Sequence, residues 1–87
     1  MQVTDLTGLK EQITEIARGS PVGDRVEDVS VEAEDDGDGS PFLRIVLKMK
    51  KLDDLEVSEV EPLVVSIEDA VSSVDERFAS VRFAEAA

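Results

Sequence analysis

Hydrophobic and polar residues alternate most regularly in the segment PFLRIVLKMKK, which runs from Pro41 to Lys51. A period of two over several residues is typical of a β-strand with one face in a core. We therefore predict a strand over residues 42–50. Its core side chains would be Leu43, Ile45, Leu47 and Met49, and its outward side chains would be Phe42, Arg44, Val46, Lys48 and Lys50.

Two further segments alternate in the same way. Residues 26–34 predict a strand with an acidic outer face, and residues 77–84 predict the last strand, with Phe78 and Arg82 pointing outward. Val26 is out of phase with the alternation that follows it. Either it precedes the strand, or a β-bulge falls near Glu27–Asp28. The expected inward residues of these two strands are Val29, Val31, Ala33, Ala79, Val81 and Phe83.

Helical spacing of apolar residues predicts two helices, at 4–18 and 58–75. For the first, Thr4 is the expected N-cap, Asp5 suits the positive end of the helix dipole, and Gly19 marks the end. For the second, Ser58 and Glu61 have the spacing of a capping box. Pro62 then falls within the first turn, or the regular helix begins at Pro62 itself.

The order of elements is α-β-β-α-β in a single domain spanning 1–87. The Asp/Gly-rich segment 35–41 predicts a hairpin, which makes the first two strands antiparallel. A helical crossover then makes the second and third strands parallel. We predict an α+β two-layer sandwich in which two helices cover one face of a three-stranded mixed sheet. Strand order 1-2-3 is favoured, with 2-1-3 as the alternative.

Composition narrows the function. The 87 residues carry a formal charge of −12 and include no cysteine and no histidine. Thiolate nucleophiles, disulfides and the commonest metal ligands are thus excluded, and we predict a protein that is not an enzyme and has no cofactor. The negative charge disfavours nucleic acid and anionic membranes and favours a basic partner, or it serves only solubility or salt adaptation. Without an apolar run of membrane-spanning length or a signal peptide, we expect a cytoplasmic protein.

The hairpin segment also invites comparison with a calcium loop. Glu34, Asp36, Asp38 and Gly39 loosely match loop positions 1, 3, 5 and 6 of an EF-hand. Position 12, which should be a bidentate glutamate, would be Ile45, and strands flank the loop in place of helices. We therefore predict no metal site.

Candidate interaction residues lie on two faces. Aromatic residues and a valine among Arg and Lys on the outer sheet face indicate an interface, whereas the alternative is a solvated face whose cations neutralise the acidic strand. The outer face of the second helix has acidic residues and no basic residue. The predicted interaction residues are Phe42, Arg44, Val46, Lys48, Lys50, Phe78, Arg82, Glu59, Glu61, Glu68 and Asp69.

The runs GDGSPFLRIVL and DERFASVRF resemble those of a group of small, acidic, mostly uncharacterised bacterial proteins. Members of that group accompany HEPN-type toxin-like partners, so the resemblance implies an antitoxin-like or accessory role. The α-β-β-α-β order is also similar to the cytoplasmic domain of cation-diffusion transporters, but the metal-binding histidines of that family are missing from this sequence. This second similarity concerns topology alone.

Three functional hypotheses follow. The first is an acidic module that binds a protein with a basic surface. The second is a homo-oligomer that assembles through the open sheet face, which Phe42→Glu or Phe78→Glu would dissociate. The third is a carboxylate-based enzyme or cation-binding module. A sharper variant of the first is a mimic of nucleic acid that inhibits its partner. In that hypothesis the carboxylates standing in for phosphates would be those of Asp35, Asp36, Asp38, Glu59, Glu61, Glu68 and Asp69.

Overall fold

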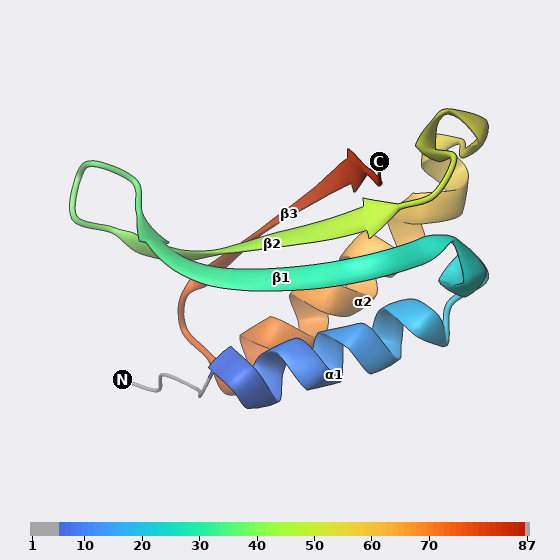
Figure 1. The fold of residues 1–87 in the computed structure, drawn as a ribbon. Coiled ribbons are helices and arrows are strands. Elements are labelled where there is room, and N and C mark those ends of the chain that lie inside the picture. Colours follow the sequence, from blue (N-terminus) through green and yellow to red (C-terminus); the bar gives the residue numbers. More distant parts are fainter. Residues whose placement is uncertain (1–5, 87) are drawn as a thin grey trace.

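The computed structural model describes residues 6–86 and has the predicted α-β-β-α-β order (Figure 1). Short 3-10 turns precede the first strand and follow the second. Thr4 and Asp5, the predicted cap and dipole residues, lie outside the described residues. The bounds are α1 Leu6–Arg18, β1 Val26–Asp35, β2 Pro41–Met49, α2 Val57–Val74 and β3 Phe78–Glu85, with 3-10 turns at Gly23–Arg25 and Leu52–Asp54.

The sheet has the order β1-β2-β3, which confirms the favoured prediction. β1 and β2 are antiparallel, β2 and β3 are parallel, and both helices lie on the same side of the sheet (Figure 1). The pairing of β1 with β2 shifts between Val26 and Asp28, so of the two explanations for the phase of Val26 the bulge is the correct one. The extra residue restores the phase of the alternation, so Val26 and Val29 are both buried although they are three positions apart.

β2 supplies the centre of the core. Leu43, Ile45, Leu47 and Met49 are all 0% exposed, as their alternation predicted. They lie against buried apolar stripes on both helices. Full burial of a side chain of this size contributes about 1.5–3 kcal/mol, so this strand is the largest single source of hydrophobic stabilisation. The helix residues opposite are Leu9, Ile13 and Ala17 of α1 and Leu63, Ile67 and Val71 of α2, while Val31, Val81 and Phe83 are partly buried beside them.

The hairpin loop is organised by two aspartates. Oδ1 of Asp35 accepts hydrogen bonds from the N–H groups of Gly37 at 2.8 Å and Gly39 at 3.2 Å. Oδ1 of Asp36 accepts from Asp38 at 2.8 Å and Ser40 at 3.2 Å. Gly37 and Gly39 have φ of 94° and 90°, a region in which residues with a Cβ are strained. Asp and Gly therefore form this turn for the reasons expected from their chemistry.

The start of α2 differs from the prediction. The helix begins at Val57, and the Glu59 carboxylate accepts a hydrogen bond from the Glu56 N–H at 3.0 Å. The predicted capping box of Ser58 and Glu61 is wrong by two residues, because the same spacing of polar residues occurs twice in succession. Pro62 consequently lies inside the helix, beyond its first turn.

The segment that connects β2 to β3 also begins and ends at other residues than predicted. β2 ends at Met49, so Lys50 follows the strand, and its Nζ lies 3.4 Å from a Glu27 carboxylate oxygen. α2 ends at Val74 and β3 begins at Phe78. Arg77, predicted to start the strand, lies in the turn because its side chain is held by Asp75.

Candidate protein-interaction surfaces

The side chains that alternate with the core residues form the outer face of the sheet. Within residues 6–86 no helix covers this face, since α1 and α2 both pack on the opposite side (Figure 1). Strand register aligns the residues of the face in rows across the three strands. The rows are Glu34–Phe42–Phe78, Glu32–Arg44–Ser80, Ser30–Val46–Arg82 and Asp28–Lys48–Ala84.

The row nearest the hairpin loop is aromatic. Phe42 and Phe78 are direct partners in the β2–β3 pairing, and Phe78 is 68% exposed. Together with Asp36, Ser40, Pro41 and Ser80 they line a shallow cavity of about 380 Å³. The Arg44 guanidinium carbon lies 5.9 Å from the centre of the Phe42 ring, which is within cation–π range. One end of the outer face thus presents an apolar surface bordered by a cation.

Charge on the outer face is divided by strand. β1 contributes only acidic charge, whereas β2 and β3 contribute basic charge. Arg44 is satisfied within the face, with Nε 3.1 Å from a Glu34 carboxylate oxygen. In the described part of the chain, Glu32, Lys48 and Arg82 make no ion pair. Unpaired charges of both signs therefore lie on one surface.

The predicted interaction residues separate into two surfaces. Phe42, Arg44, Val46, Lys48, Phe78 and Arg82 share the outer face of the sheet. Glu59, Glu61, Glu68 and Asp69 are exposed on α2, in the other layer. Glu59 also caps the helix, and Lys50 belongs to neither surface because it lies beyond β2 and pairs with Glu27.

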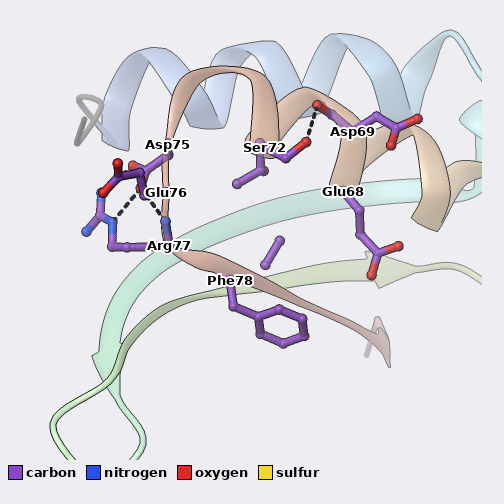
Figure 2. A pocket seen from close by; sticks show the side chains of 9 residues that line it. Glu68, Asp69, Ser72, Asp75, Glu76, Arg77 and Phe78 are labelled. Carbon is purple, nitrogen blue, oxygen red and sulfur yellow. Dashed lines mark hydrogen bonds and ion pairs between the residues drawn. The ribbon is translucent and has the colours of Figure 1, made fainter. Parts of the chain in front are cut away.

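A groove between α2 and β3 was not predicted from the sequence (Figure 2). Its volume is about 420 Å³. Glu68 extends from α2 toward the strand layer, and Phe78 lies at the start of the strand (Figure 2). The lining is completed by Asp69, Val71, Ser72, Asp75, Glu76, Arg77 and Ala79.

Asp75 and Arg77 close one end of this groove. The Asp75 side chain is 0% exposed, and that of Arg77 is 11% exposed. Oδ1 of Asp75 also accepts the Arg77 backbone N–H at 2.9 Å. The hydrogen bond to Asp75 raises the pKa of Arg77 above its ordinary value, against the opposing effect of burial. In the sequence, the signal for this ion pair was an acidic residue two positions before an arginine at the end of a predicted helix.

No group of three Asp or Glu side chains within residues 6–86 is arranged to hold a metal ion. In the hairpin loop, Asp35 and Asp36 each direct one oxygen to backbone N–H groups. No helix in the described part of the chain is long and apolar enough to span a membrane.

No protein-family model and no curated protein matches the sequence. Solved structures of similar fold include one described as the mode of action of a putative zinc transporter, CzrB. It has a TM-score of 0.65 and 19% identity, over 93% of this chain and 92% of that chain. A variant of MamM has a TM-score of 0.54 and 14% identity, over 97% of this chain and 100% of that chain. At these identities the comparisons establish the fold alone, and the chain shares that α-β-β-α-β fold with both.

Proposed function

We propose that this protein is a non-enzymatic interaction module that assembles with a second copy of itself through the outer face of the sheet. The observation that carries the proposal is the exposed Phe78 beside Phe42, on a face that α1 and α2 leave open. Exposed apolar area costs free energy in water, at roughly 25 cal/mol per Å². Burial against a second copy removes that cost, and clustered exposed aromatics are typical of interfaces.

The charges of the outer face support a second copy as the occupant. In a two-fold dimer each copy presents the same surface, so the surface must complement itself. A two-fold axis parallel to the strands, between β1 and β2, sets β1 of each copy over β2 of the other and leaves β3 at the border of the interface. Each Glu32 then lies over an Arg44 and each Asp28 over a Lys48, because these residues share rows. Opposite charges therefore meet across such an interface.

The size of the face sets the expected affinity. In that arrangement two strands of nine and ten residues overlap, which gives a flat footprint of about 10 by 30 Å per copy. That area is below the range of stable protein interfaces and corresponds to a weak, transient one. The proposal is therefore a concentration-dependent dimer with a dissociation constant in the micromolar range, rather than an obligate one.

The similarity of fold to a chain from a putative zinc transporter supports the non-enzymatic part of the proposal, because that protein is described as a transporter. The antitoxin-like role beside a HEPN-type partner, and cytoplasmic residence, stay predictions from the sequence.

Sedimentation velocity over a concentration series tests the dimer. The sedimentation coefficient is expected to rise with concentration for the native protein and to stay at the monomer value for Phe42→Glu, because Phe42 lies on β2 inside the interface. Val57→Glu is the matched control, because Val57 is 74% exposed but lies on α2, away from the sheet face. A native protein that remains monomeric at millimolar concentration, or equal loss of the dimer in the Val57 variant, contradicts the proposal.

A basic partner is the second candidate, favoured by the acidic surface of α2. Glu61, Glu68 and Asp69 are exposed there, and no basic residue occurs in the helix. A mimic of nucleic acid would use the same carboxylates. Co-purification from the native host at low salt is expected to retain such a partner, and elution at about 0.5 M salt is expected to release it. Recovery of the protein without a partner at low salt contradicts this candidate.

A further inference from the structure

The outer edge of β3 is open for pairing. β2 is the central strand, so β3 has a strand neighbour on one side only among residues 6–86. Every second residue of an edge strand turns its backbone N–H and C=O groups away from the sheet. The groove beside α2 includes Phe78 and Ala79 of β3 and no residue of β1 or β2. It therefore lies beside the start of the free edge, at Phe78 and Ala79.

The two edges of the sheet are not equivalent. β1 carries a bulge near Glu27 and the acidic residues Glu27, Asp28, Glu32, Glu34 and Asp35. Bulges and charges are features that prevent edge strands from pairing with other chains. β3, with the sequence FASVRFAE, has continuous pairing with β2, no proline and one charge of each sign. The free edge of β3 therefore lacks the protection that β1 has.

The groove is acidic. Glu68, Asp69 and Glu76 line it with acidic side chains. The cation at its end, Arg77, is engaged by Asp75 through two side-chain hydrogen bonds. A strand lying beside β3 would thus meet uncompensated negative charge from the side of α2.

A second copy does not fit this edge. Antiparallel pairing of two β3 strands around a two-fold axis makes one continuous sheet, with both α2 helices on the same side of it. Glu68 and Asp69 of one copy would then approach the same residues of the other. Like charges brought together in this way are destabilising, and the acidic flank therefore selects against self-pairing.

From this geometry we infer that the β3 edge and the acidic flank of α2 form a docking site for an extended, basic segment of another protein. The segment adds a strand beside β3 through backbone hydrogen bonds. Its alternate side chains turn toward α2, where lysine or arginine meets Glu68 and Asp69. The site shares Phe78 with the outer face but uses the edge of β3, and it does not depend on the proposed self-assembly.

A fluorescent eight-residue peptide of alternating lysine and valine, matched to the length of β3, is the probe. Fluorescence anisotropy is expected to show saturable binding. Methylation of every second backbone nitrogen in the peptide removes its donors on one edge and is expected to abolish binding. In 15N-labelled protein, the amides of Phe78–Glu85 are expected to shift and to exchange more slowly with solvent, whereas those of Val26–Asp35 do not.

Charge-matched variants separate a defined site from general attraction to an acidic protein. Glu68→Gln combined with Asp69→Asn is expected to weaken binding about fivefold. Glu11→Gln combined with Glu15→Gln removes the same charge from exposed positions on α1 and is expected to change binding less than twofold.

Three results overturn the inference. The first is equal binding of the backbone-methylated peptide, and the second is equal weakening by the two double variants. The third is concentration-dependent protection of the β3 amides without peptide, which means that a second copy occupies the edge. Phe42 does not line the groove, so sedimentation of Phe42→Glu tests the outer face alone, and failure of either proposal is distinguishable from failure of the other.

Discussion

Arg77 binds Asp75 through two nitrogens on one edge of its guanidinium group: Nε lies 3.0 Å from Oδ1, and Nη2 lies 2.7 Å from Oδ2. Asp75 is the buried charged residue of the described chain, and it follows directly after α2. A paired arrangement with two parallel hydrogen bonds fixes geometry as well as charge. The pair therefore sets the angle at which the chain leaves α2 and enters β3.

Replacement of Asp75 by alanine is expected to lower the free energy of unfolding by about 3 kcal/mol, because Arg77 loses its partner and buried donors are left unsatisfied. Glu76→Ala, at the exposed neighbouring position, is the control and should change it by less than about 0.5 kcal/mol. Urea unfolding measures both.

The raised pKa of Arg77 means that the contribution of its ion pair to stability is lost only when the pH rises through that value. The deficit of Arg77→Ala should therefore be the same at pH 7 and pH 10.

Two glycines should respond to alanine in opposite directions. A Cβ at Gly23 would lie 2.7 Å from the Arg18 carbonyl carbon and still closer to its oxygen, so Gly23→Ala is expected to destabilise by about 2 kcal/mol. A Cβ at Gly8, on the exposed side of α1, would meet nothing within 4 Å. Gly8→Ala is expected to stabilise by ~0.5–1 kcal/mol through helix propensity. Thermal unfolding of the two variants checks the sign of each change.

Charge reversal tests whether the outer face complements itself. Asp28→Lys and Lys48→Glu should each weaken the proposed dimer about tenfold, since each sets like charges against each other. Both residues are exposed and make no ion pair within residues 6–86, so neither change breaks an ion pair in the monomer. The double reversal should restore the dissociation constant to within about twofold. Additive weakening in the double variant would mean that these charges do not meet across the interface.

Calcium should leave the thermal midpoint unchanged to within about 1 °C at millimolar concentration, because Asp35 and Asp36 already bind backbone N–H groups of their own loop. Asp36→Ala removes two of these acceptor contacts and is expected to cost about 1 kcal/mol with or without calcium. A rise in midpoint with calcium that Asp36→Ala abolishes would show instead that the loop is a cation site.

The strands and their faces were predictable because alternation is a local property of the sequence. It assigned Leu43, Ile45, Leu47 and Met49 to the core, and the change of phase at Val26 gave a bulge as one of two explanations, which the structure selects. The start of α2 was not predictable at the level of single residues. Glu56–Glu59 and Ser58–Glu61 have the same spacing, and only the packing of the chain after β2 selects the first.

Of the two candidate surfaces, one could be predicted from the sequence and the other could not. The outer face follows from strand parity, so Phe42, Arg44 and Phe78 were placed together from the sequence. The groove beside β3 depends on where α2 lies across the sheet, which no pattern within α2 encodes. Burial of Asp75 likewise depends on tertiary packing. The sequence around Asp75 resembles the ordinary polar end of a helix.

The parallel pairing of β2 with β3 has a consequence for the order of folding. β1 and β2 are joined by the short Asp/Gly loop, so their pairing closes a short loop and costs little conformational entropy. β3 reaches its place only after α2 has returned the chain across the sheet, which makes its contacts the most distant in sequence among the strand pairs. We expect pulse-labelled hydrogen exchange to protect the β1–β2 hairpin first and β3 last. On a ribosome, the nascent chain would hold an incomplete two-stranded sheet until residues 78–85 emerge.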